Sequence, residues 1–153
     1  MKKLREKDIA PKFNLLADDD KEYSLASFKG NKVLIYFYPR DNTPGCTTEA
    51  CSLRDNFKEM KKLGLIVLGI STDDNKSHKK FKEKYKLPFL LLSDVEHKVC
   101  ESYGVWTNKK FMGREYMGVQ RTSFLIDEKG KIEKIYEEVK PAEHASEVIS
   151  DLK

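Results

Sequence analysis

The residues of this 153-residue chain that could do chemistry are its three cysteines, Cys46, Cys51 and Cys100. Cys46 follows an apolar run of β-branched and aromatic residues that ends at Pro39, and it precedes a pattern typical of a helix. Unpaired backbone N–H groups and the positive end of the helix dipole stabilise a thiolate in the first turn of a helix. Because the thiolate is the nucleophilic form of cysteine, Cys46 is predicted to attack an electrophile.

A second cysteine lies five residues further along the same predicted helix. If Cys46 and Cys51 both belong to one regular helix, a rise of about 1.5 Å and a rotation of about 100° per residue place their Cα atoms roughly 8.7 Å apart. A disulfide needs a Cα separation below about 7 Å. The two sulfurs are therefore expected to bond only after the first turn of the helix unwinds.

The residues just before Cys46 suit a nucleophilic site. Thr43 lies three residues earlier, and its hydroxyl could reach the sulfur or an oxygen of a bound substrate. Pro39 and Pro44 restrict the backbone of the turn, and Gly45 allows a substrate to approach the main chain closely. A lone threonine in a turn is more often a local backbone cap, so a functional role for Thr43 depends on the pattern as a whole.

The elements that must position these residues alternate between strands and helices. Residues 32–92 contain three apolar runs typical of strands and two patterns typical of helices. The first run is nearly continuous, which predicts a central strand buried on both faces. The strands are predicted at Lys32–Tyr38, Leu65–Ile70 and Phe89–Leu92, and the helices at Thr47–Leu63, which Gly64 follows, and at Ser77–Tyr85.

The second half of the chain continues the alternation and ends in a hairpin and a helix. A short helix is predicted over Val95–Tyr103, before Gly104, and the segment Trp106–Gly118 is predicted to be a loop. The other predicted elements are an antiparallel hairpin of Val119–Ile126 and Lys131–Glu137, a last helix from Pro141 to Leu152, and an added N-terminal hairpin of Phe13–Leu16 and Lys21–Ser24. This order predicts an α/β fold with a sheet between helices, and one domain spanning residues 1–153.

Composition and charge exclude several classes of function. The 29 basic and 25 acidic residues are interleaved, so nucleic-acid binding, which usually needs a basic stripe, is not expected. No segment approaches the ~18 consecutive apolar residues of a membrane span, so no membrane partner is expected. An odd number of cysteines argues against a structural disulfide framework and for thiol chemistry in a reducing compartment, which predicts a cytoplasmic protein.

The segment around Cys46 resembles the active site of a known family. Pro39-x-x-x-Thr43-x-x-Cys46 has the form of the peroxiredoxin motif. The extended Pro-Gly-Cys-Thr-x-x-x-Cys, which ends at Cys51, is similar to the bacterioferritin comigratory protein, or PrxQ, branch of that family. The resemblance covers nearly the whole chain, including Ser71-Thr72-Asp73, Ser93-Asp94, Tyr103-Gly104-Val105 and the segment from Arg121 to Asp127.

This resemblance implies a fold and a set of site residues. The fold is thioredoxin-like, of the peroxiredoxin type, with a central mixed sheet flanked by helices and an N-terminal β-hairpin extension. Cys46 is the implied peroxidatic cysteine, with Thr43 and Pro39 as its hydroxyl-bearing and shielding partners. Arg121, expected on a later strand, is the implied guanidinium that pairs with the thiolate and orients the peroxide. Glu49 resembles the acidic residue that holds this arginine, although acidic residues also cap helix N-termini.

The resemblance further implies a thiol-dependent peroxidase that reduces hydrogen peroxide and organic hydroperoxides in antioxidant defence. Cys46 becomes a sulfenic acid, and Cys51 then attacks it as the resolving cysteine to form an intramolecular disulfide. Thioredoxin or a similar dithiol is the implied reductant of that disulfide. Neither a metal nor another cofactor is expected, and the branch suggests a monomer or a weak dimer.

The remaining cysteine and the histidines have plainer interpretations. Cys100 is expected to face the core as a small hydrophobic residue, with a role as a second resolving thiol as the alternative. His78, His97 and His144 have no metal-ligand spacing to one another or to a cysteine, and are expected at the surface or at helix ends.

Three other functions would use similar residues. A copper-binding module on a thioredoxin-like scaffold would use two cysteines and a histidine, but the gap between Cys46 and Cys51 is wide for it, and Thr43 and Arg121 would have no role. A disulfide oxidoreductase usually has Cys-x-x-Cys spacing, in which both thiols are reachable without unwinding. A redox sensor that binds a partner after the same oxidation stays open as an additional role.

Overall fold

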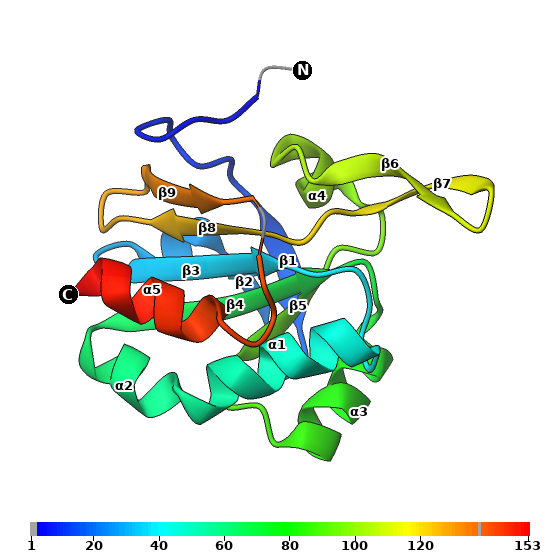
Figure 1. Ribbon diagram of the computed structural model, residues 1–153. Coiled ribbons are helices and arrows are strands. Elements are labelled where there is room, and N and C mark those ends of the chain that lie inside the picture. The colour runs from blue at the N-terminus through cyan, green and yellow to red at the C-terminus, as the bar shows by residue number, and fades with distance from the viewer. Residues whose placement is uncertain (1–2, 138) are drawn as a thin grey trace.

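A mixed seven-stranded sheet forms the centre of the molecule (Figure 1). The computed structural model describes residues 3–137 and 139–153. The strand order in the sheet is β2-β1-β5-β4-β3-β8-β9, and β6 pairs with β7 in a separate two-stranded sheet. The strands are β1 (Asn14–Ala17), β2 (Glu22–Ser24), β3 (Lys32–Phe37), β4 (Leu65–Ser71), β5 (Leu90–Ser93), β6 (Trp106–Phe111), β7 (Arg114–Val119), β8 (Thr122–Ile126) and β9 (Ile132–Tyr136).

Strand β3 is central, as the sequence predicts. It pairs in parallel with β4 on one side and antiparallel with β8 on the other, and β5 continues the parallel part next to β4. The predicted N-terminal hairpin is also confirmed, because β1 and β2 pair antiparallel. The helices are α1 (Pro44–Asp55), α2 (Phe57–Lys62), α3 (Asn75–Tyr85), α4 (Lys98–Ser102) and α5 (His144–Leu152), with a short 3-10 helix, η1, at Leu25–Phe28.

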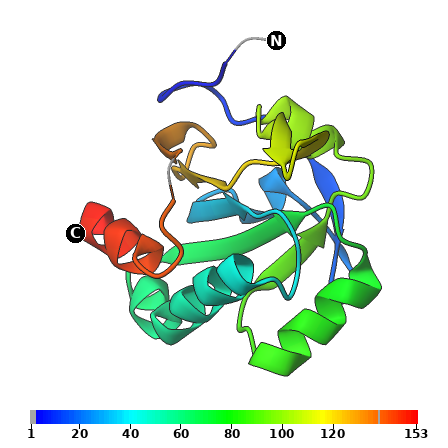
Figure 2. The same ribbon diagram turned by 45° about the vertical axis from the view of Figure 1, so that its right-hand side comes forward.

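The side chains of β3 alternate between two hydrophobic clusters, one on each face of the sheet. Leu34 and Tyr36 pack in a cluster to which α1, α2, α3 and α5 contribute. Val33 and Ile35 pack in a second cluster, which contains residues of α4 and of the N-terminal segment. Figure 2 shows α1, α2 and α3 together on one side of the sheet. The layered α/β architecture predicted from the sequence is therefore confirmed.

The prediction of one long helix over residues 47–63 is wrong, because this segment forms two helices. Helix α1 begins earlier than predicted, at Pro44, and α2 begins at Phe57. Asn56 separates them, and its side-chain amide donates to the Ser52 carbonyl oxygen at 2.8 Å. Asparagine side chains that bond to the backbone compete with helical hydrogen bonds. The apolar period runs across the break because both helices bury the same side of the segment.

The prediction of a loop over residues 106–118 is also wrong. Strands β6 and β7 form an antiparallel hairpin in register from Trp106↔Val119 to Phe111↔Arg114. The two turn residues, Met112 and Gly113, both have positive φ, as a type I′ turn requires. Figure 1 shows this hairpin projecting from the body of the molecule. Most of its side chains are exposed, so it lacks the apolar alternation by which a half-buried strand is detected.

The remaining predicted elements are correct in type and differ at their ends. Helix α4 is shorter than the predicted segment 95–103, and the last helix begins at His144, after a turn that contains Pro141. Strand β8 begins at Thr122, so Arg121 lies immediately before a strand and not on it. In the part of the chain that the structure describes, no helix is both long and apolar enough to cross a membrane.

Candidate active site

Cys46 is the third residue of α1, at the carboxyl end of β3. Thr43 is the N-cap residue of the helix, and Pro44 occupies the first helical position. The first amides of a helix have no intrahelical acceptor, so Gly45 and Cys46 present N–H groups at the end where the helix dipole is positive. Cys46 itself is 1% exposed. The predicted position of Cys46 in the first turn of a helix is confirmed.

Arg121 brings the guanidinium expected from the sequence to the sulfur. Its Nη2 donates to Cys46 Sγ at 3.4 Å, and its Nη1 donates to Glu49 Oε1 at 2.7 Å. Burial opposes the charge of Arg121, but Glu49 and Cys46 outweigh it and raise the pKa of the guanidinium. The guanidinium therefore stays charged, with one side of its planar fork on the carboxylate and the other on the sulfur.

Gly45 makes room for this arrangement. A Cβ atom at Gly45 would lie 3.0 Å from Arg121 Nη2, closer than side chains normally approach. From the sequence, Gly45 is interpreted as a position where substrate approaches the backbone. The structure adds a second reason for glycine at this position, which is the close passage of the guanidinium.

Glu49 lies one helical turn after Cys46 and is completely buried. Burial raises the pKa of Glu49 to about 7, although Arg121 acts in the opposite direction through its charge and its hydrogen bond. Its second oxygen, Oε2, is buried and has no hydrogen-bond partner among the described residues. Among the described residues, Arg121 is therefore the hydrogen-bond partner of the Glu49 carboxyl group. This pairing suits a residue that orients the arginine.

Thr43 and Pro39 lie in the loop that joins β3 to α1, as expected. The Thr43 hydroxyl donates to the Arg40 carbonyl oxygen at 2.8 Å, the local bond that is usual for a threonine in a turn. Its oxygen lone pairs stay available as hydrogen-bond acceptors. Pro39 is half-buried at the start of the loop.

Cys51 lies on the same helix as Cys46, and its thiol is free and half-buried. It lines a shallow groove of about 470 Å³ together with residues of α1 and Ala142. Because both cysteines belong to one continuous helix, the separation of roughly 8.7 Å expected for five residues of regular helix applies to them. The two thiols are thus on the same element and are kept apart by its regular form.

Cys100 is completely buried on α4, in the cluster on the opposite face of the sheet from Cys46. Burial, and then a hydrogen bond to Asp94, raise the pKa of the Cys100 thiol far above its ordinary value. The predicted role as a small buried hydrophobic residue is confirmed by this position. The sheet separates Cys100 from Cys46, which argues against the alternative of a second resolving thiol.

The prediction that all three histidines lie at the surface or at helix ends is wrong for His78 and incomplete for His144. His97 is the half-exposed N-cap residue of α4, as predicted. His144 begins α5 but is buried, and burial lowers its pKa. His78 is completely buried in the middle of the Lys-rich helix α3. Its spacing of three residues from the buried Phe81 is the signal that could have placed it on the inner face of that helix.

His78 also lies close to two carboxylates that the sequence places far away. Ligand atoms of Asp41, Asp73 and His78 all lie within 4.8 Å of one another. Each of the three side chains takes part in hydrogen bonds inside the protein, including one of 2.7 Å between His78 Nδ1 and Asp41 Oδ2. These bonds account for the clustering, so we interpret the three residues as a hydrogen-bond network.

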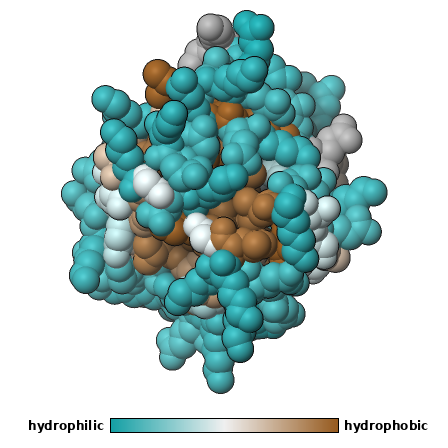
Figure 3. All heavy atoms as spheres, turned by 90° about the vertical axis from the view of Figure 1, so that its left-hand side faces the viewer, coloured by the Kyte–Doolittle hydropathy of each residue, from teal (hydrophilic) through white to brown (hydrophobic). Residues whose placement is uncertain are grey.

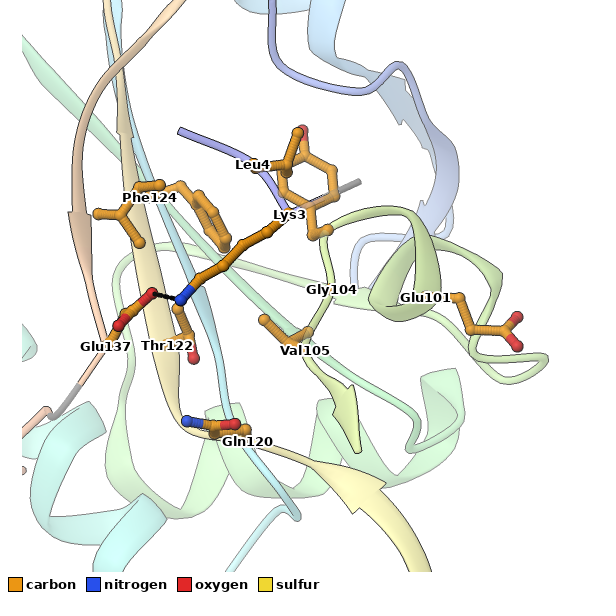
Figure 4. Close-up of a pocket in the computed structure, with 11 residues that line it drawn as sticks. Lys3, Leu4, Glu101, Gly104, Val105, Gln120, Thr122, Phe124 and Glu137 are labelled. Atoms are coloured by element: carbon orange, nitrogen blue, oxygen red, sulfur yellow. Dashed lines mark ion pairs between the residues drawn. The ribbon is translucent and has the colours of Figure 1, made fainter. Parts of the chain in front are cut away.

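Two other hollows lie away from Cys46. A cavity of about 330 Å³ lies beside the N-terminal segment, where Lys3 pairs with Glu137 at 3.1 Å across its mouth (Figure 4). A more apolar pocket of about 360 Å³ is lined by residues around Phe28, Val33 and Ile126. Figure 3 shows the end of the molecule at which β3 begins, with apolar side chains in a hollow among hydrophilic ones. Neither cavity includes a cysteine.

One known protein family matches most of this chain. The model of the AhpC/TSA family matches residues 7–135. Peroxiredoxin Bcp of Escherichia coli (strain K12) is 51% identical over 153 residues, which cover 100% of this chain and 98% of that protein. The chain belongs to the AhpC/TSA family. Within it, the chain is a peroxiredoxin of the Bcp, or PrxQ, branch, and it is a thiol peroxidase.

Other relatives of this family share both sequence and fold. Peroxiredoxin Bcp of Bacillus subtilis (strain 168) is 46% identical over 144 residues, which cover 94% of this chain and 92% of that protein. The structure of peroxiredoxin Q from Xanthomonas campestris superimposes with a TM-score of 0.87 at 34% identity, covering 92% of this chain and 89% of that chain. A further structure of the Xanthomonas campestris bacterioferritin comigratory protein, at a TM-score of 0.86, is described in terms of alkyl peroxide reduction activity. The predicted family, branch and fold are confirmed.

Proposed function

We propose that this peroxiredoxin reduces hydrogen peroxide and alkyl hydroperoxides, with Cys46 as the peroxidatic cysteine. The observation that carries the proposal is the position of Cys46, in the first turn of α1 with the Arg121 guanidinium 3.4 Å from its sulfur. Helix N-terminus and guanidinium both favour the thiolate. The alkyl peroxide activity described for the Xanthomonas campestris relative supports the organic substrates.

In the first step, the Cys46 thiolate attacks the terminal oxygen of the hydroperoxide. An S–O bond forms as the O–O bond breaks, so sulfur is oxidised to a sulfenic acid and the peroxide is reduced. The leaving oxygen takes a proton from solvent and departs as water or an alcohol. Arg121 is placed to bind the peroxide oxygens as charge moves onto the leaving oxygen, and Glu49 holds the guanidinium in the required orientation.

In this proposal Thr43 and Pro39 complete the pocket around the sulfur. The Thr43 hydroxyl donates to a backbone carbonyl, so its oxygen is oriented to accept a hydrogen bond from the peroxide O–H. Pro39 has no N–H and shields one side of the loop. Thr43 would thereby orient the terminal oxygen for attack.

In the second step, Cys51 attacks the sulfenic sulfur of Cys46. An S–S bond forms, the S–O bond breaks, and the hydroxide leaves as water. Because a disulfide needs Cα atoms closer than about 7 Å, the first turn of α1 must unwind before this bond forms. The half-buried position of Cys51 beside the groove supports its role as resolving thiol.

The groove beside Cys51 also supports an external dithiol as reductant. Thioredoxin or a similar protein would reduce the Cys46–Cys51 disulfide by thiol exchange and allow α1 to refold. Resolution within one chain needs no second subunit, which supports a monomer or weak dimer. A cycle that depends on reduced thiols supports a cytoplasmic location.

Peroxide consumption coupled to thioredoxin, thioredoxin reductase and NADPH tests the proposal. The wild type is expected to turn over. Cys46→Ser is expected to be inactive, and Cys51→Ser is expected to undergo a single oxidation without efficient turnover. Cys100→Ser, on the opposite face of the sheet, is the matched control and is expected to retain turnover. Full turnover by Cys46→Ser would show that Cys46 is not the peroxidatic cysteine.

A further inference from the structure

A buried hydrogen-bond network holds the loop that carries Pro39 and Thr43. Tyr38 and His78 are completely buried, and Asp41 is 8% exposed. The Tyr38 hydroxyl donates to Asp41 Oδ1 at 2.6 Å. Asp41 Oδ2 lies 2.7 Å from His78 Nδ1 and accepts from the Ser77 hydroxyl at 2.8 Å. Both oxygens of the Asp41 carboxylate are therefore hydrogen-bonded, by partners from the loop itself and from α3.

The other nitrogen of His78 fixes the protonation of the pair. His78 Nε2 lies 3.0 Å from the carbonyl oxygen of Leu92, which can only accept, so Nε2 carries a hydrogen. The short contact between Nδ1 and the Asp41 carboxylate then contains a second proton, shared between a base and an acid. Hydrogen bonds of this charge-assisted kind are among the strongest in proteins. His78 thus joins the loop to α3 and to β5.

The backbone of the loop is fixed at the same place. The Asp41 amide donates to Asp73 Oδ2 at 2.8 Å, and that carboxylate also accepts from the Ser71 hydroxyl at 2.7 Å. The next residue, Asn42, has a φ of 57°, and its side-chain oxygen accepts from the Tyr85 hydroxyl at 3.1 Å. Asparagine tolerates this left-handed conformation because its short side chain can bond locally. Residues 41 and 42 are therefore attached to the end of β4 and to α3.

The first turn of α1 has a different kind of support. Among the hydrogen bonds of the described residues, Cys46 and Glu49 are bound from outside the helix through the side chain of Arg121. The remaining side-chain bond of this turn, from the Thr48 hydroxyl to the Pro44 carbonyl oxygen at 3.0 Å, lies within the helix. Hydrogen-bonded attachment to β4 and α3 thus reaches as far as Asn42, and the turn proposed to unwind begins at the end of this loop, where support from outside the helix comes through Arg121.

We propose that the Asp41–His78 pair is the anchor of the active-site loop, and that His78 is a positioning residue for peroxide reduction. The proposal rests on the proposed role of Cys46. By fixing the backbone at Asp41, the pair holds Thr43 and the start of α1 at their places relative to Arg121. It also sets the point at which unwinding of α1 stops, so the loop before Thr43 keeps its conformation in the disulfide form.

Two substitutions of His78 separate this role from simple filling of the core. The side-chain amide nitrogen of asparagine takes the place of Nδ1, so His78→Asn keeps the donor to Asp41 and loses the bond to Leu92. The amide nitrogen of glutamine takes the place of Nε2, so His78→Gln keeps the bond to Leu92 and loses the donor to Asp41. A residue that only fills the core predicts the opposite order, because asparagine is shorter than glutamine by one methylene and leaves the larger cavity at this completely buried position.

The test measures the rate at which peroxide oxidises Cys46 in each variant by stopped-flow fluorescence. His78→Gln is expected to react roughly tenfold or more slowly than the wild type, since small misplacements of reacting groups have effects of this size or larger. His78→Asn is expected to stay within about threefold of the wild type. Hydrogen exchange at the Asp41 amide is expected to be faster in His78→Gln than in His78→Asn.

The outcomes are distinguishable from a failure of the proposed function. If peroxide does not oxidise wild-type Cys46, with Cys46→Ser as the blank, the proposed function is wrong. If the wild type reacts but the two variants react equally fast, or His78→Asn is the slower one, the anchor is wrong. Should either variant not fold, Ser77→Ala removes one donor to Asp41 from a half-buried position. That variant is expected to react several-fold more slowly, and a wild-type rate would overturn the anchor.

Discussion

Arg121 is the residue on which the geometry of the site depends. Its two terminal nitrogens donate to different residues, Cys46 and Glu49, which both lie in the first half of α1. Because the guanidinium is planar and rigid, fixing one nitrogen on the Glu49 carboxylate also fixes the direction of the other toward the sulfur. Glu49 achieves this from a completely buried position, which has a cost in stability that depends on pH.

The variant Glu49→Gln tests how the burial of the Glu49 carboxyl group changes the free energy of unfolding with pH. Burial raises the pKa of Glu49 to about 7 in the folded protein, whereas the carboxyl of an unfolded chain titrates near 4.3. The folded state therefore binds this proton more tightly. As the pH rises through this interval, the wild type is expected to lose on the order of 3 kcal/mol of unfolding free energy relative to the variant. Urea unfolding at several pH values between about 4 and 8 measures the difference, and a difference independent of pH would contradict the assignment.

At the scale of single residues, the sequence identifies those site residues that lie close together along the chain. Cys46, Cys51 and Thr43 are found because they lie within nine positions of one another in a motif, and Arg121 and Glu49 follow from the family resemblance. His78 contacts Asp41, which lies 37 positions earlier in the sequence. The other residues of the helix that carries His78 are mostly lysines and other polar residues. No local pattern encodes such a pairing, so only the folded chain shows it.

The first turn of α1 is the element that combines packing with chemistry. Its Gly45 lies against the Arg121 guanidinium, and its Cys46 and Glu49 are buried. In the reduced protein this turn is regular helix, which keeps the two thiols apart. The proposed cycle therefore requires a first turn that is stable enough to form the site and weak enough to unwind after oxidation.

Gly45→Ala is expected to slow the oxidation of Cys46 without lowering the stability of the protein. Alanine is a better helix former than glycine, so the free energy of unfolding is expected to stay equal or to rise slightly. The added Cβ meets Arg121 Nη2 at 3.0 Å and displaces the guanidinium from the sulfur, which is expected to slow Cys46 oxidation several-fold. In an Arg121→Ala background the same change is expected to have no further effect. A full additional loss in that background would contradict this explanation.

Hydrogen exchange tests the unwinding of the same turn. The amides of residues 45–50 are expected to exchange faster in the Cys46–Cys51 disulfide form than in the reduced form, because the bond requires closer Cα atoms than a regular helix allows. The amides of β3 and β8 serve as an internal control, and their exchange is expected to be the same in both forms. Equal exchange of the turn in both forms would mean that resolution proceeds without unwinding.

The strands that the sequence predicts well are the buried ones. Strands β3, β4 and β5 are detected as apolar runs because both of their faces are buried, and α3 is predicted from a pattern typical of helices. The β6–β7 hairpin and the break at Asn56 were missed for different reasons. The hairpin is stabilised by backbone pairing with mostly exposed side chains, and the break depends on one side-chain bond to Ser52.

At the scale of the whole molecule, the sheet separates Cys46 and Cys100, which belong to two different hydrophobic clusters. Cys46 packs with the helices α1, α2, α3 and α5, while Cys100 packs with α4 on the opposite face. Redox chemistry at Cys46 therefore acts on one layer of the fold. The consequence is that the site and that layer of the core share a residue, since Cys46 belongs to both, and its neighbour Ala50 in α1 packs in the same cluster.

This sharing predicts that the disulfide form is less stable than the reduced form. Unwinding the first turn of α1 removes Cys46 and its neighbours from the cluster, and the lost burial amounts to on the order of 2 kcal/mol. For a domain of this size that corresponds to a fall in Tm of about 4 to 8 °C.

Differential scanning calorimetry of the reduced protein and of the peroxide-oxidised protein measures this difference in Tm. Cys100→Ser is expected to show the same difference, and Cys51→Ser, which cannot form the bond, is expected to lack it. An oxidised wild type with a Tm equal to or above that of the reduced form would show that the first turn keeps its packing when the disulfide forms.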